Sequence, residues 1–141
     1  MSSVPPPSQL CLLSALPQRR VGDKVRFLGC VKSYSPASGV LNLEHRLLED
    51  TSSVVALVDV NLVLESLGAG QTRNGEWVNV IGYITDINHL ADCKGSTAGH
   101  PKICVQALLI WSAGPVDTQR YTASLRALHP EKHFASRQNP P

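Results

Sequence analysis

The chain has 141 residues, enough for one domain that buries a core without disulfides or metals. Hydrophobic residues make up 43% and charged residues 17%, which excludes a disordered tail and indicates a folded globule. The net charge of +2 is too small to indicate nucleic-acid binding by itself, so any basic patch has to be local.

The N-terminal part of the chain is predicted to be flexible and then to join the domain. Residues 1–8 are rich in Ser and Pro, and Pro5–Pro7 interrupts any run that could act as a signal peptide. Residues 9–16 are apolar and are expected to add an extra strand or turn. The following Arg19–Asp23 is typical of a turn.

The first two main strands form a predicted hairpin. Lys24–Ser33 is an apolar run with Gly29 near its middle, and an isolated glycine in a strand pattern predicts a bulge or a sharp bend. Ser35–Gly39 is a turn segment, and Val40–His45 follows as strand two with alternating apolar side chains.

A short helix is predicted between strands three and four. Val54–Val60 is rich in β-branched residues and is strand three. Asn61 can cap a helix over Leu62–Leu67, and Gly68 can end it in the left-handed conformation. Trp77–Asn88 is then strand four, with Gly82 as its second bend.

A long irregular loop, residues 89–102, leads to strand five over Ile103–Ser112. Asp117 or Thr118 then caps a helix that runs to about His129. We therefore expect a flexible segment 1–8, a domain over residues 9–130 that includes a C-terminal helix at about 117–129, and a flexible tail over 131–141.

The order of these elements predicts an all-β fold, a single OB-fold. This is a five-stranded Greek-key barrel with a short helix between strands three and four, here followed by a C-terminal helix. An SH3-like barrel also has five strands, but it does not normally place a helix after strand three. OB-folds mostly bind, so the sequence indicates a binding module.

The C-terminal helix carries the most specific surface signal. Tyr121, Leu125 and Leu128 form one helical stripe. The stripe either docks a partner or packs on its own barrel, because periodicity does not say whose core it joins.

A nucleic-acid groove is the second candidate site. OB-folds bind nucleic acid on strands two and three and on the neighbouring loops, through cations and aromatic rings. The residues near those places are Arg26, Lys32, Tyr34, Arg46, Lys94, His100 and Lys102. With aromatic residues at 5% of the chain, a solvated surface with scattered charges explains this set equally well.

The remaining sequence motifs give only weak evidence for metal binding or catalysis. His89 and Cys93, and likewise His100 and Cys104, have a superficial metal-ligand spacing, but no CxxC pair supports zinc, and we expect no metal or cofactor. Gly95–Gly99 has threonine where a nucleophile elbow has serine, so we expect no enzyme. The four cysteines, without a signal peptide or a membrane-spanning run, favour a soluble intracellular protein with reduced thiols.

Three segments resemble the small Ten subunit of the telomere-capping CST (Cdc-Stn-Ten) complex, in its fungal branch. They are Val21–Val31, Val58–Leu67 and Gly75–Thr85, within a resemblance that spans roughly Val21–Trp111. The resemblance implies an RPA-like OB subunit that pairs with a Stn-type OB subunit and joins a third large subunit. It places the protein in the nucleus, at telomeres.

The resemblance also implies a function. The complex would bind single-stranded telomeric DNA, protect chromosome ends and regulate fill-in synthesis. The partner-docking role falls on Tyr121, Leu125 and Leu128, helped by Trp111, while no DNA-contact residue is transferred. The alternative is an independent OB-fold protein that binds single-stranded DNA or RNA.

Overall fold

The structure is a computed structural model, which describes residues 7–45, 54–88 and 101–128. Its elements in chain order are β1 (Gln9–Leu10), η1 (Leu13–Gln18), β2 (Lys24–Ser35), β3 (Val40–Glu44), β4 (Val55–Asp59), η2 (Asn61–Ser66), η3 (Ala69–Gln71), β5 (Trp77–Asn88), β6 (Lys102–Ser112) and α1 (Thr118–Leu128). The predicted flexible segments fall mainly on residues 1–6 and 129–141, outside the described residues, so they stay predictions.

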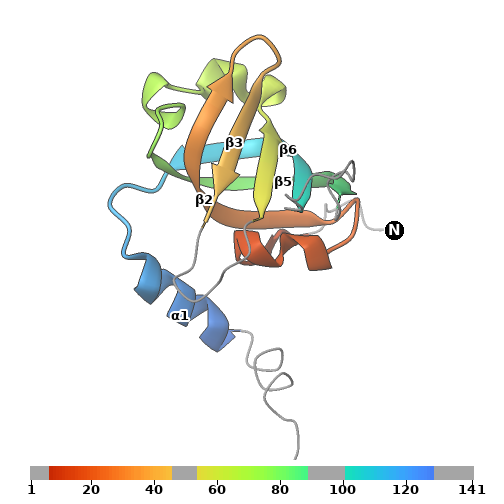
Figure 1. The fold of residues 1–141 in the computed structure, drawn as a ribbon, viewed down its shortest axis with the longest axis vertical. Coiled ribbons are helices and arrows are strands. Elements are labelled where there is room, and N and C mark those ends of the chain that lie inside the picture. The colour runs from red at the N-terminus through yellow and green to blue at the C-terminus, as the bar shows by residue number, and fades with distance from the viewer. Residues whose placement is uncertain (1–6, 46–53, 89–100, 129–141) are drawn as a thin grey trace, which may run out of the picture.

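The strands form one sheet in the order β1-β2-β3-β4-β6-β5, and β2 also pairs with β5, which closes a five-stranded barrel. β4 and β6 pair in parallel, as the crossover between them requires, and the other barrel strands pair in an antiparallel way. Figure 1 shows the barrel with α1 on its outside, joined by a linker. The predicted OB-fold is confirmed.

β2 bends so that it pairs with two different strands along its length. Its first half, Lys24–Cys30, pairs with β5, and its second half pairs with β3. Gly29 lies at this transition, where an added Cβ would come within 3.0 Å of Leu13 and Leu43 side-chain atoms. The bulge itself lies at Lys32, where the register with β3 shifts.

Gly82 marks the second irregularity, at a bulge in the pairing of β5 with β6. A Cβ on Gly82 would lie 2.3 Å from the backbone oxygen of Gln106. Only glycine permits this approach of the two backbones. The sequence-based expectation of a bulge at this glycine is confirmed.

The barrel interior is filled by the alternate side chains of all five strands, and Phe27 is the largest of those that are fully buried. η1 adds Leu13 and Leu16, which are also fully buried. The two-residue strand β1 pairs in parallel with β2 and leads directly into η1. The segment expected as an extra strand or turn therefore supplies both and belongs to the core.

The connection between β4 and β5 differs from the predicted single helix. It consists of two short 3-10 turns, η2 and η3, and Gly68 is extended (φ −93°) rather than left-handed. Asn61 does not cap the helix: it is the first residue of η2, the N-cap position is Val60, and no side chain caps the turn. The Asn61 Nδ2 instead donates to Asp59 Oδ1 (2.8 Å) and to the Ser38 carbonyl (3.2 Å). These bonds tie η2 to the β2–β3 hairpin.

Candidate partner-docking surface

α1 begins with a side-chain cap. The Arg120 backbone N–H donates to Asp117 Oδ1 (3.2 Å), and the Tyr121 N–H donates to the Asp117 carbonyl (3.0 Å). An acceptor at this position satisfies N–H groups that the first helical turn leaves unpaired. The predicted start of the helix at Asp117 or Thr118 is thus confirmed.

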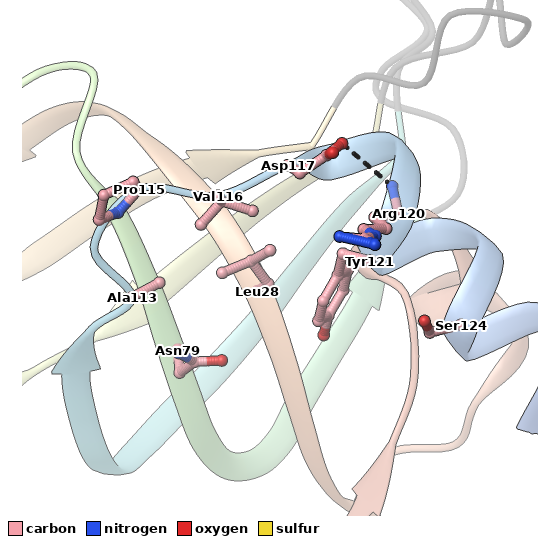
Figure 2. A pocket seen from close by; sticks show the side chains of 9 residues that line it. All are labelled: Leu28, Asn79, Ala113, Pro115, Val116, Asp117, Arg120, Tyr121 and Ser124. Atoms are coloured by element: carbon pink, nitrogen blue, oxygen red, sulfur yellow. Dashed lines mark hydrogen bonds between the residues drawn. The ribbon is translucent and has the colours of Figure 1, made fainter.

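A groove of about 440 Å³ lies between α1, its linker and the outside of the barrel. Figure 2 shows the side chains that line it: Leu28, Asn79, Ala113, Pro115, Val116, Asp117, Arg120, Tyr121 and Ser124. Leu28 points away from the barrel core on β2, yet it is only 2% exposed. Apolar linker residues and α1 cover it, so the groove has an apolar wall and a polar rim.

The predicted helical stripe is divided between two environments. Leu125 is 4% exposed and Tyr121 is half-buried, so both are covered by the chain itself. Leu128 is 63% exposed. The first two residues therefore hold α1 in place, and Leu128 and the groove are what a partner can reach.

Aromatic contacts join α1 to the barrel. The His45 ring, at the end of β3, packs edge-on against Trp77 of β5 with 5.2 Å between centroids, and it lies 6.1 Å from the Tyr121 ring. Burial lowers the pKa of His45 below its ordinary value of 6.5, and the backbone of Leu28 opposes part of this shift. His45 is therefore a neutral packing residue at the contact with α1.

The Tyr121 ring packs against the barrel, but its hydroxyl is buried without a hydrogen-bond partner among the described residues. Burial raises the pKa of its hydroxyl, and the nearby Arg26 charge opposes the shift. Among the described residues, Tyr121 Oη and Thr122 Oγ1 are buried and have no hydrogen-bond partner. Such groups are costly, so the contact between α1 and the barrel is not an optimised one.

Arg26 and Trp111 were predicted for two different sites, and the structure brings them together. The Arg26 guanidinium carbon lies 5.3 Å from the Trp111 ring centroid, a cation–π contact on the outside of the barrel. The pairing registers place Arg26 beside Ile81, and Ile81 beside Leu109, which is 56% exposed. This apolar flank continues the surface beside the α1 groove, because Asn79 of the groove pairs with Trp111.

The other predicted nucleic-acid residues are dispersed. Lys32 lies at the β2 bulge beside Cys30 and Glu44, and Lys102 begins β6, separated from Glu44 by Val55 of β4. The Tyr34 ring is partly packed against the core. Three predicted residues, Arg46, Lys94 and His100, lie outside the described residues.

Acidic groups share the outer face of the barrel with these lysines. Three acidic residues occupy outward positions: Glu44 of β3 beside Val55 at the start of β4, Asp59 at the end of β4, and Asp86 of β5 beside Cys104 of β6. Single-stranded nucleic acid needs a cationic groove with exposed rings. The described part of this face does not form such a groove.

The remaining candidates among the described residues are metal ligands, thiols and membrane-spanning helices. No group of three or more potential metal ligands occurs within residues 7–45, 54–88 and 101–128, while His89, Cys93 and His100 lie outside these ranges. Cys30 and Cys104 are half-buried free thiols, and burial raises the pKa of both. Among the described helices, none has the length and apolarity to cross a bilayer.

Sequence reasoning missed the barrel side of the groove. Leu28 and Asn79 were not expected to line the groove, and His45 was not expected to pack near Tyr121. One signal was present, because Leu28 is apolar at a position of β2 where the alternation predicts an exposed side chain. An apolar side chain on the outer parity of a barrel strand indicates that something covers it.

Comparison with known proteins gives the family. A family model described as "Ten1: Telomere capping, CST complex subunit" matches residues 1–126. The curated "Protein ten1" of Schizosaccharomyces pombe is 35% identical over 75 residues, which are 53% of this chain and 63% of the relative's length.

Solved structures agree in fold. A chain in the crystal structure of the S. pombe Stn1-ten1 complex matches with a TM-score of 0.61 at 27% identity, over 89% of this chain and 94% of that one. A chain of U. maydis Replication protein A bound to ssDNA matches with a TM-score of 0.52 at 22% identity, over 91% and 96%. With the family model covering nearly all of the described residues, the chain belongs to the Ten1 family of telomere-capping CST complex subunits.

Proposed function

We propose that this chain is a non-catalytic telomere-capping subunit that binds a Stn-type OB subunit through α1 and the adjoining flank of the barrel. The surface consists of the α1 groove, the exposed end of α1 at Leu128, and the flank formed by Arg26, Leu109 and Trp111. The observation that carries the proposal is the incomplete contact of α1 with its own barrel. A groove remains there, and exposed apolar groups adjoin it.

Two arguments support a protein partner rather than a small ligand. The buried Tyr121 and Thr122 hydroxyls lack hydrogen-bond partners among the described residues, so a partner that reshapes this contact can improve it. The polar rim and apolar wall are also typical of non-obligate interfaces. The likeness to a chain of the S. pombe Stn1-ten1 complex makes a Stn-type subunit the partner of choice.

The test is co-purification with the Stn-type subunit of the same species. We expect Leu128→Asp combined with Ser124→Trp to abolish the heterodimer, because the first buries a carboxylate in the interface and the second fills the groove. Val21→Asp is the matched control, since Val21 is 59% exposed in the turn before β2. A heterodimer of unchanged affinity in the double variant would show that the partner binds elsewhere.

We propose that single-stranded telomeric DNA is bound mainly by the assembled complex, which includes a third large subunit, at chromosome ends in the nucleus. The acidic groups on the outer face support this division, because they oppose phosphate binding by the free subunit. End protection and regulation of fill-in synthesis are the corresponding roles. The alternative, an independent DNA or RNA binder, requires measurable binding by the isolated chain.

A further inference from the structure

A second surface lies at η2, and it does not overlap the α1 groove. In Figure 1, η2 and η3 lie at the end of the barrel away from α1. A groove of about 650 Å³ is formed there between η2 and Leu108 of β6. Two of its side chains are unusually exposed for leucine, Leu62 at 63% and Leu64 at 46%.

The backbone of β6 has a free edge beside this groove. β4 pairs with β6 only from Lys102 to Gln106, because β4 ends at Asp59 and the chain turns into η2. β6 continues to Ser112 with β5 on its other side. Among the described residues, no strand pairs with the β4-side edge of Leu109–Ser112. Alternate N–H and C=O groups of this segment bond to β5, and the others face this edge without a strand partner.

The charge of the groove indicates what can occupy it. Glu65 is the only ionisable side chain among the residues that line it, and the structure gives it no ion-pair partner within the described ranges. Phosphate is therefore disfavoured, and so is a second copy of the chain, which would bring another acidic groove to the same edge. A basic side chain next to apolar side chains is complementary to Glu65 and the leucines.

We propose that this edge binds an extended segment of another protein by strand addition. The segment pairs with Leu109–Ser112 where β4 leaves the sheet, places alternate apolar side chains against Leu62 and Leu64, and carries a lysine or arginine toward Glu65. Main-chain hydrogen bonds to an exposed sheet edge supply affinity in this mode, and the pockets for alternate side chains supply specificity. The site does not include the α1 groove, but it adjoins the Stn-binding flank, because Leu109 and Trp111 belong to both.

The experiment selects random ten-residue peptides, displayed on phage, against the full-length chain and then measures the synthetic peptides by titration. We expect enriched peptides with alternating apolar residues and at least one basic residue. Leu62→Asp should weaken their binding at least about tenfold by placing a charge in the apolar contact. Glu65→Lys should switch the selected charge from basic to acidic, and Val21→Asp should have no effect.

Hydrogen exchange identifies the binding mode. A bound peptide should slow the exchange of backbone amides within Leu109–Ser112. Leu128→Asp combined with Ser124→Trp, the pair expected to abolish the Stn contact, should leave peptide binding unchanged. The proposal is overturned by a selection without enrichment, by peptides that bind Leu62→Asp normally, or by binding that leaves these amides unprotected. A concentration-dependent dimer that Leu62→Asp dissolves would also overturn it, since the edge would then bind a second copy.

Discussion

At the residue scale, Gly82 is a position of β5 where the backbone of β6 leaves no room for a side chain. A methyl group there would lie 2.3 Å from the Gln106 backbone oxygen, and backbone atoms cannot turn aside as a flexible side chain can. We expect Gly82→Ala to lower the free energy of unfolding by about 3 kcal/mol, measured by urea denaturation. Gly70→Ala is the control, because a Cβ there meets no atom within 4 Å, and a similar loss in both variants would contradict the steric explanation.

His45 gives the molecule a pH dependence with a definite sign. Its pKa is lower in the folded protein than its ordinary 6.5, so the unfolded state binds the proton first as the pH falls. Stability is complete above the unfolded pKa and is lost as the pH falls below it. We expect the melting temperature to drop between about pH 7.5 and pH 5.5, and His45→Phe to reduce that drop. An identical drop in the variant would assign the effect to other groups.

At the element scale, α1 is held by a few residues of one face. Leu125 is buried and Leu128 is exposed, so the two leucines of the same stripe should respond differently to the same substitution. We expect Leu125→Asp to detach α1, at a cost of about 2–4 kcal/mol, and Leu128→Asp to leave it attached. Hydrogen exchange of the α1 amides measures this directly, with the barrel amides as the internal reference. Equal exchange in both variants would mean that Leu125 does not anchor the helix.

At the scale of the whole molecule, the distribution of charge limits what the free subunit can bind. Glu44 lies beside Lys32 and is separated from Lys102 only by Val55, and Asp86 lies two residues from Asn88, which pairs with Lys102. We expect the isolated chain to show no binding of a telomeric oligonucleotide at physiological salt in a fluorescence anisotropy titration. A salt-dependent signal from the isolated chain would favour the independent nucleic-acid binder.

The assembled complex should behave differently. There, Lys32→Ala with Lys102→Ala should weaken DNA binding. It should also reduce the magnitude of the slope of log affinity against log salt by about 1.4, because each phosphate contact on a single strand contributes about 0.7 through the counterions that it releases, and two contacts are removed. An unchanged slope would show that these lysines do not contact phosphate.

The sequence predicts the barrel well because its signals are local. Alternation defines the strands, and Gly82 marks a bulge that only glycine permits. The connection after β4 was predicted less well, because Asn61 has a strong capping propensity but lies inside η2, where its Nδ2 bonds to Asp59 and to Ser38 of the distant β2–β3 hairpin. For the docking surface, periodicity identifies the stripe on α1. Which leucine of the stripe is buried depends on where the linker places the helix against the barrel, and no local sequence pattern encodes that position.

The two tryptophans of the chain give it a natural optical reporter. Trp77 touches the imidazole of His45, and Trp111 lies under the Arg26 guanidinium on the flank beside α1. Each indole thus has a different cationic or ionisable neighbour. Their fluorescence should therefore distinguish protonation of His45 from binding of a partner at the flank, without any added dye. Acidification should quench the fluorescence of Trp77, whereas a partner bound at the flank should exclude water from Trp111 and shift its emission wavelength.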